Sequence, residues 1–124
     1  MTIVIILIYR IKKGDNMTRT AKNFFRIEMV LLKIIDSGEE CYGYQIVQTL
    51  KKQSDGHINI AEGTMYPILY KLTDQGYITS ERRLINKRQT RVYYKITPEG
   101  KQYLEQLYQH YLTITGCIKN IMSD

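Results

Sequence analysis

The fold of this chain is decided by a stretch that begins AEGTMYPILYKL at residues 61–72 and ends RVYYKITPEG at residues 91–100. Its first part predicts a helix over residues 61–75, because the apolar side chains recur at the spacing of one helix face. Those side chains are Met65, Ile68, Leu69 and Leu72. Pro67 lies near the helix start, where a missing backbone donor is partly tolerated, and Gly76 supplies a left-handed exit.

A β-hairpin is predicted directly after this helix. Residues 77–84 and 90–96 are rich in β-forming side chains and predict two strands, joined by a polar tip at residues 85–89. Between Thr79 and Lys95 there are six basic side chains and one acidic side chain, a net charge of +5 in 17 residues. A helix with a small, polar start followed by a cationic ribbon is typical of proteins that read DNA. In such proteins the helix enters a major groove and the ribbon, or wing, lies on the phosphates.

The N-terminal side predicts two more helices and one extended segment. Residues 24–35 have apolar side chains on more than one helix face, which indicates burial on several sides. Residues 42–53 place aliphatic side chains on a single face, and residues 57–60 read as an extended piece able to pair with the wing as an edge strand. The predicted fold is therefore mainly α with a small β-hairpin wing, a winged helix-turn-helix domain over residues 17–97.

A long helix is predicted from residue 98 onward. Thr97 is its expected N-cap, Pro98 takes the first helical position and Glu99 adds an acid to the first turn. Apolar residues then recur at alternating steps of three and four, the heptad pattern of a coiled-coil seam. They are Leu104, Leu107, Tyr111, Ile114, Ile118 and Ile121. One reading packs this helix on its own domain; because three helices and a wing already complete that domain, we expect residues 98–124 to form a dimerisation helix.

Size, charge and cysteines set broader limits. The 124 residues suffice for one domain with one core, and the net charge of +6 favours polyanionic partners only weakly. Cys41 and Cys117 lie far apart and show no zinc-site spacing, which fits a reducing cytosol; a redox switch is the alternative. The sequence has no nucleophile elbow, phosphate loop or paired-carboxylate signature, so we expect no enzyme activity, metal or cofactor.

Residues 1–16 are interpreted as an extension that the natural protein lacks. The apolar run at residues 3–8 is too short to span a bilayer and has no features of a signal peptide. Residues 12–16 back-translate to AAA AAA GGA GAT AAC just before Met17, which contains the purine-rich element of a bacterial ribosome-binding site. We therefore expect translation to start at Met17, with a strand or a disordered tail as the alternatives. Removing three basic residues and one acidic residue leaves a net charge of +4.

Three motifs together resemble the PadR family of bacterial transcriptional regulators, which have a winged helix-turn-helix fold. GYQI at residues 43–46 is similar to the family's Gly-Tyr-x-Ile opening of the second helix. GTMYPIL at residues 63–69 resembles its recognition-helix signature, and YYKITPEG at residues 93–100 resembles its wing exit. Their order and spacing agree over residues 24–112, and the resemblance implies a DNA-binding regulator.

Departures from the family pattern limit what can be transferred. The family often has Arg-Leu-Glu late in the recognition helix, whereas residues 71–73 are Lys-Leu-Thr, so base preference does not carry over. The single C-terminal helix looks like that of a short-form member. Some members stack aromatic drugs between tryptophans at the dimer centre, but this chain has no tryptophan.

Candidate DNA contacts come from the second helix, the recognition helix and the wing. They are Tyr44, Thr64, Tyr66, Lys71, Lys87, Arg88 and Arg91. Thr64 lies near the start of the recognition helix, where base edges and phosphates are within reach, and a contact from Tyr66 is implied by the resemblance. The plainer reading is capping or packing for Tyr44, Thr64 and Tyr66, and a solvated surface for the cations. Arg91 has the further alternative of lying on the outer face of its strand.

These features predict a sequence-specific, homodimeric transcriptional regulator in the cytoplasm, most simply a repressor, with no membrane segment. A two-fold dimer predicts a pseudo-palindromic operator in double-stranded DNA, with half-sites roughly 34–36 Å apart. A small aromatic or apolar effector is implied by the resemblance alone; its candidate pocket is Tyr103, Tyr108 and Tyr111, with plain packing as the alternative. The rival functions are a winged-helix protein-interaction module and a ligand sensor without specific DNA binding.

Overall fold

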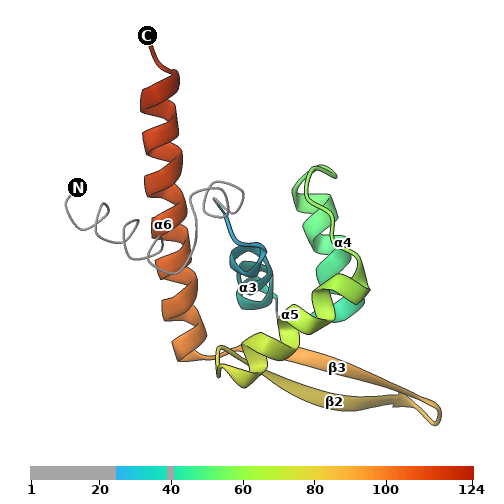
Figure 1. Cartoon of the computed structure of the whole chain (residues 1–124). Helices are drawn as coiled ribbons and strands as arrows, with labels where there is room; N and C mark the ends of the chain where they lie inside the picture. Colours follow the sequence, from blue (N-terminus) through green and yellow to red (C-terminus); the bar gives the residue numbers. More distant parts are fainter. Residues whose placement is uncertain (1–24, 39–40) are drawn as a thin grey trace. The chain divides into compact units, whose positions relative to one another are not determined.

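The computed structural model describes residues 25–38 and 41–124, so the expectation for residues 1–16 lies outside the described residues. Figure 1 shows their elements, which are α3 (Ile27–Ser37), β1 (Cys41–Tyr42), α4 (Gly43–Gln53), α5 (Glu62–Asp74), β2 (Ile78–Asn86), β3 (Gln89–Ile96) and α6 (Pro98–Met122). These elements confirm a mainly α fold with a β-hairpin wing. The described residues form two compact units. One spans Ile27–Leu104, and the other contains Phe25, Arg26 and Glu105–Asp124.

The core of the first unit lies between its three short helices and the base of the hairpin. The largest fully buried side chains are Leu31, Leu32, Ile46, Met65, Leu69, Leu72 and Ile78. They come from α3, α4, α5 and β2, so each of these elements turns an apolar face inward. Because Met65, Leu69 and Leu72 are buried, the opposite face of α5 is left in solvent.

The hairpin is longer and its turn tighter than predicted. The strands are antiparallel in the order β1–β3–β2, and β2 and β3 pair from Ile78↔Ile96 to Asn86↔Gln89. The turn therefore holds only Lys87 and Arg88 rather than residues 85–89. Asn86 explains the difference, since its Oδ1 accepts a hydrogen bond from the Arg88 N–H at 2.9 Å and its Nδ2 donates to Gln89 Oε1 at 3.3 Å.

The expectation that residues 57–60 form the edge strand is wrong. The third strand is β1, which pairs with β3 through Cys41↔Tyr94 and Tyr42↔Tyr93. Residues 57–60 instead fold onto the end of α4, where the Ile58 N–H donates to Ser54 Oγ at 3.0 Å. Two residues in left-handed conformation, Asp55 with φ of 51° and Gly56 with φ of 78°, form the turn that precedes this segment.

The base of the wing is tied to α5 and α6 by backbone hydrogen bonds. Gly76 leaves α5 with φ of 80°, and the Tyr77 N–H donates to the Leu72 carbonyl at 3.0 Å, as expected for a glycine-terminated helix. Thr97 caps α6 as predicted, because its Oγ1 accepts from the Gly100 N–H at 3.0 Å. The same hydroxyl donates to the Gly76 carbonyl at 2.7 Å, so one threonine joins the end of α5 to the start of α6.

We expect Gly100→Ala to destabilise this junction. Gly100 is buried, and an added Cβ would collide with the Tyr77 carbonyl oxygen and lie 2.8 Å from Ile96 Cγ1. Overpacking of this kind costs about 1–3 kcal/mol. The matched control is Gly116→Ala in the same helix, where a new Cβ meets nothing within 4 Å and helix propensity improves by up to about 1 kcal/mol. Chemical unfolding of both variants checks this, and equal stability of Gly100→Ala and the wild type would contradict it.

Candidate nucleic-acid interface

The polar face of α5 is available for contact with a partner. Thr64, Tyr70 and Lys71 are exposed on this helix. Its start has no side-chain cap, and Gly63 in the first turn leaves open space around its backbone. Because no bulky side chain covers this helix start, its backbone N–H groups can approach a phosphate or a base edge closely.

Tyr66 packs directly against the start of α4. A Cβ at Gly43 would lie 2.7 Å from Cζ and 2.9 Å from Cε1 of the Tyr66 ring, so only glycine leaves room for this ring. Two of the three sequence motifs therefore meet in space, the glycine of GYQI and the tyrosine of GTMYPIL. Tyr66 therefore has a packing role, one of the two roles expected for it. Tyr44, next to Gly43 in α4, is instead 58% exposed.

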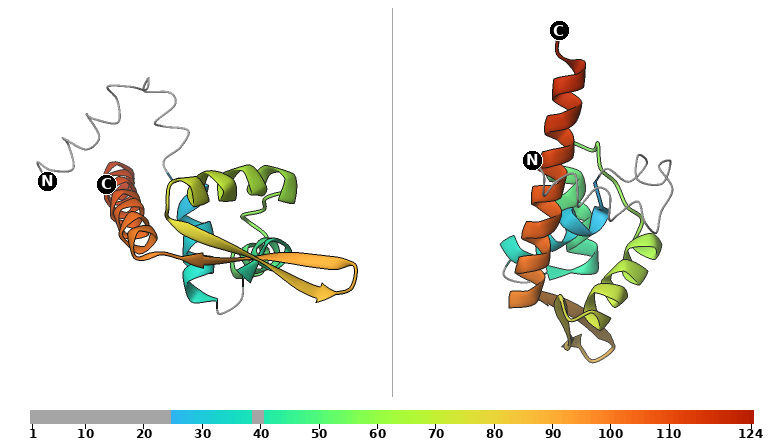
Figure 2. Two further views of the ribbon diagram at one scale, coloured as in Figure 1. Left: turned by 90° about the horizontal axis from the view of Figure 1, so that it is seen from below. Right: turned by 60° about the vertical axis from the view of Figure 1, so that its left-hand side comes forward.

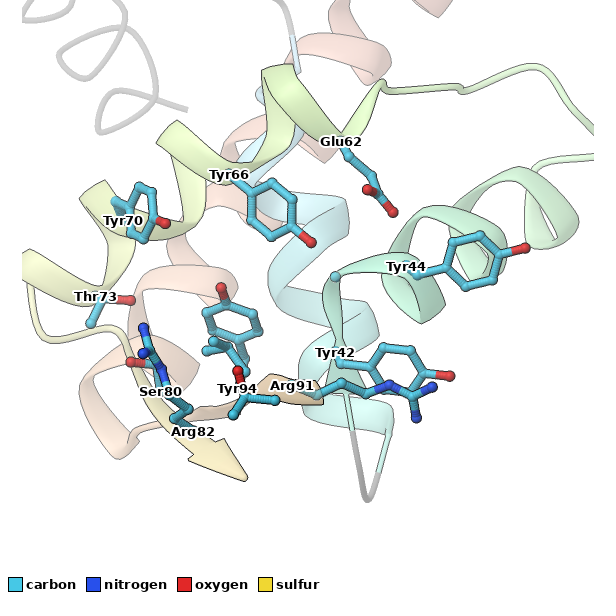
Figure 3. Close-up of a pocket in the computed structure, with 13 residues that line it drawn as sticks. Tyr42, Tyr44, Glu62, Tyr66, Tyr70, Thr73, Ser80, Arg82, Arg91 and Tyr94 are labelled. Carbon is cyan, nitrogen blue, oxygen red and sulfur yellow. The ribbon is translucent and has the colours of Figure 1, made fainter. Parts of the chain in front are cut away.

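A depression of about 630 Å³ lies between the start of α4, α5 and the hairpin. Figure 3 shows the side chains that line it. Its lining is rich in phenol groups and also carries two guanidinium groups and one carboxylate. These residues are Tyr42, Tyr44, Tyr66, Tyr70, Tyr94, Arg82, Arg91 and Glu62. Phenol hydroxyls and guanidinium groups are the donors that bind phosphate oxygens in protein–DNA complexes.

Tyr66 and Tyr94 are neighbours within this depression (Figure 3). Burial raises the pKa of the Tyr66 hydroxyl, and Glu62 and Tyr70 raise it further. Burial also raises the pKa of Tyr94, with smaller contributions from Tyr66 and Tyr70. Both hydroxyls therefore remain protonated well above neutral pH and can donate hydrogen bonds to an anion.

Arginine and tyrosine side chains stack on one another along the sheet. The guanidinium of Arg91 lies 4.3 Å from the ring centroid of Tyr42, and that of Arg83 lies 4.4 Å from Tyr93. The two rings meet edge to face at 5.6 Å, and Arg83 also pairs with Glu81 at 3.1 Å. Such cation–π contacts hold guanidinium groups in place without neutralising them. Arg91 is thus positioned by Tyr42 while it also lines the depression.

The wing tip carries the other predicted cations. Lys87 and Arg88 are exposed, and neither forms an ion pair with any residue that the structure describes. In Figure 1 and in the left view of Figure 2 the outer end of the hairpin extends past α3, α4 and α5. These charges are therefore presented to solvent on a turn that Asn86 holds rigid.

The predicted contact residues do not form a single cluster. Tyr44, Tyr66 and Arg91 line the depression, whereas Thr64 and Lys71 are exposed on α5 outside it. Sequence reasoning missed Tyr70, which is 65% exposed, and Arg82, both of which line the depression. The signals were present in the sequence. Tyr70 follows Tyr66 at the i+4 spacing of one helix face, and Arg82 shares its strand face with Ser80.

The three tyrosines of the expected effector pocket have different surroundings. Tyr103 belongs to the first unit, where its ring stacks on Tyr77 at 4.2 Å and its hydroxyl donates to Glu28 Oε2 at 3.0 Å. Tyr108 and Tyr111 belong to the second unit, where their ring planes are nearly parallel and their centroids lie 6.4 Å apart. Tyr103 thus has a structural role in packing α6 against α3.

The predicted dimer seam becomes more exposed toward the end of α6. Leu107, Tyr111 and Ile114 are half-buried, whereas Ile118 is 44% and Ile121 is 80% exposed. Met122 beside them is 77% exposed. Large aliphatic side chains at this exposure and at heptad spacing are typical of a surface that a partner covers.

The cysteines give no support to a redox switch at Cys41. Cys41 is buried, its Sγ donates to the Ile34 carbonyl at 3.6 Å, and burial raises the pKa of its thiol. Such a thiol reacts poorly. Cys117 is exposed, and both cysteines are free.

Residues 25–38 and 41–124 contain no group of three or more His, Cys, Asp or Glu side chains that could hold a metal ion. Within the same ranges, none of the helices has the length and apolar character needed to cross a membrane.

Comparison with known proteins gives consistent results. Residues 31–106 match the Transcriptional regulator PadR-like family. A transcriptional regulator of Mycobacterium tuberculosis is 33% identical over 67 residues, which are 54% of this chain and 59% of the relative. A transcriptional regulator from Clostridium thermocellum is similar in structure, with 28% identity and a TM-score of 0.71 over 78% of this chain and 93% of that one.

A further solved structure contains DNA. It is Bacillus subtilis PadR in complex with operator DNA, which is 29% identical with a TM-score of 0.59. The match covers 64% of this chain and 46% of that one, so the chain spans less than half the length of the DNA-bound regulator.

Proposed function

Because this chain belongs to the PadR-like family of transcriptional regulators, we propose that it is a homodimeric repressor that binds a specific operator in double-stranded DNA. Members of this family are transcriptional regulators and not enzymes. The proposal is carried by one observation: the exposed face of α5 and the arginine-bearing hairpin border the same depression. In this arrangement α5 enters the major groove while the hairpin lies on the flanking backbone.

Each group of side chains has a distinct task in this proposal. Thr64 at the start of α5 contacts base edges, and Lys71 further along contacts a phosphate. Tyr66, Arg82 and Arg91 around the depression bind phosphate oxygens, since they present neutral donors and fixed cations. The cations at the wing tip add contacts that are independent of sequence.

Dimerisation is proposed to occur through the second half of α6. Its support is the heptad spacing together with the exposure of Ile118 and Ile121 in the single chain. A two-fold dimer places two copies of α5 on successive turns of DNA, which calls for a pseudo-palindromic operator.

A small aromatic or apolar effector is proposed to bind beside the same helix and relieve repression. Tyr108 is 46% exposed with its ring plane nearly parallel to that of Tyr111, and this pair offers flat apolar surface. Tyr103 contributes less, because Tyr77 and Glu28 already occupy its ring and hydroxyl. Thermal-shift screening of aromatic compounds tests this, since a ligand raises the melting temperature by mass action.

Fluorescence anisotropy tests the central proposal. The full chain is titrated onto labelled DNA from upstream of its own gene, at low and physiological salt, against a scrambled competitor. Tight, competitor-resistant binding supports a specific regulator. If binding is weak, equal for both sequences and abolished by salt, specific recognition of this fragment is contradicted. That result favours the rival functions, a protein-interaction module or a ligand sensor.

Thr64→Ala is expected to change sequence preference more than salt dependence. A single hydroxyl contact to a base edge contributes less discrimination than the about 1–3 kcal/mol of a bidentate pair, and it neutralises no phosphate. The measurement is the ratio of dissociation constants for the operator and for single-base variants opposite the start of α5. Thr113→Ala in α6 is the control, because it removes a similar hydroxyl whose hydrogen bond goes to Gln109 of the same helix. An unchanged ratio for Thr64→Ala would remove Thr64 from base recognition.

A further inference from the structure

The outer end of the wing carries an apolar pair that the fold does not use. Leu84 is 74% exposed and is the most exposed leucine among the described residues, and its neighbour Ile85 is 41% exposed. The buried residues of the hairpin lie at its other end, where Ile78 and Tyr94 join the core. Strand pairing does not need a leucine here either, because the partner of Leu84 across the ladder is Thr90.

The backbone around this pair is irregular and held in place. The register shifts by one residue between Leu84 and Asn86, so Ile85 is an extra residue in β2. Directly beyond it, the hydrogen bond from the Arg88 N–H to Asn86 Oδ1 fixes the turn. The two aliphatic side chains are therefore presented from a pre-ordered tip, which lowers the entropy lost on binding.

The charges around the pair indicate the chemistry of its partner. Arg82 precedes Leu84 on the same strand face, and Lys87 and Arg88 follow at the turn; all three are exposed. A partner that offered only phosphates would contact these cations but would make no favourable contact with a leucine side chain. The minor groove of DNA has both features, two rows of phosphates with apolar deoxyribose surfaces and base steps between them.

The position of Leu84 relative to α5 agrees with this partner. Side chains alternate along a strand, so Leu84 shares its face with Ser80 and Arg82, which line the depression beside α5. In the proposed complex, in which α5 lies in the major groove, the outer end of the hairpin reaches the adjacent minor groove.

We propose that Leu84 and Ile85 form an apolar wedge that enters the minor groove beside each half-site and loosens a base step there. The inference rests on the proposed function. Insertion of the wedge makes the affinity for DNA depend on how easily that base step deforms. Flexible pyrimidine–purine steps are therefore preferred over stiff A-tracts, at a position that no polar side chain contacts.

The test uses Leu84→Thr with Ile85→Thr, because threonine is β-branched and favours strands while it removes apolar surface. The probe is the upstream fragment carrying 2-aminopurine at successive steps of the flanking minor groove, whose fluorescence rises on unstacking. We expect the wild type to raise this fluorescence at one step and to bind a TA-containing fragment several-fold tighter than an A-tract one. The double variant should lose both effects and keep its salt dependence.

Two controls separate the wedge from folding and from charge. Leu84→Ile with Ile85→Val stays apolar and should retain both effects, whereas Lys87→Ala with Arg88→Ala should lower the salt dependence instead. If the wild type binds the fragment and the threonine variant matches it in affinity, step preference and fluorescence, the wedge is wrong. If the wild type binds no fragment, the proposed function fails and the wedge fails with it.

Discussion

Ile118→Asp with Ile121→Asp is expected to convert the proposed dimer to a monomer and to lower operator affinity by about 100- to 1000-fold. Ile118 is 44% and Ile121 is 80% exposed in the single chain, so the monomer tolerates a carboxylate at either position. In a dimer the same positions form the seam, where two buried, unpaired carboxylates per chain oppose association. Affinity falls because the linked second half-site is lost, and such linkage contributes about 10²–10⁴-fold.

The matched control changes the same turn on its other side. Lys119→Gln with Asn120→Asp alters the net charge by the same two units, and both positions are exposed between the two seam residues in sequence. Analytical ultracentrifugation gives the oligomeric state, and anisotropy gives the affinity. If the seam variant remains dimeric, or if both variants lose affinity equally, α6 does not dimerise through this face.

Lys87→Ala with Arg88→Ala is expected to weaken binding of the proposed dimer to every DNA sequence by more than about 100-fold. Both side chains are exposed on a turn that a hydrogen bond to Asn86 stabilises, and in the proposed complex they contact phosphates and release counterions. Each phosphate contact contributes about 0.9 to the slope of log affinity against log salt concentration. This corresponds to roughly fivefold higher affinity at physiological salt than at about 1 M salt. A dimer loses four such contacts, so the slope should become less steep by about 3 to 4.

Lys51→Ala with Lys52→Ala is the control for net charge. These two lysines are exposed in the last turn of α4 and do not line the depression. Replacing both removes two positive charges, as many as the wing-tip variant removes. Titrations at four or more salt concentrations give both slopes. Equal losses in the two double variants would show that overall charge matters and that the wing tip makes no special contact.

Local sequence signals predicted the parts of the fold that depend on neighbouring residues. The apolar face of α5, the glycine exit at Gly76 and the cap at Thr97 all occur where expected. Each depends on residues within a few positions, because helix periodicity and capping act over one or two turns. The same holds for the concentration of cations on the wing, which the sequence shows directly.

Pairing between distant segments was decided by the tertiary structure. By composition, residues 57–60 were as suitable an edge strand as Cys41–Tyr42. The second was selected because Cys41 is buried beside α3 and the Tyr42 ring packs on Tyr93. The length of the turn likewise depended on the two hydrogen bonds of the Asn86 side chain.

The composition of the candidate site shows the same division. The sequence by itself determined a winged helix with a cationic hairpin, a recognition helix starting near residue 61 and a heptad seam, since these depend on periodicity and charge along the chain. Only the tertiary structure placed Tyr66 on Gly43, stacked Arg91 on Tyr42 and brought Tyr70 and Arg82 to one depression. Such contacts join residues far apart in sequence, and packing of the shared core is what brings them within reach.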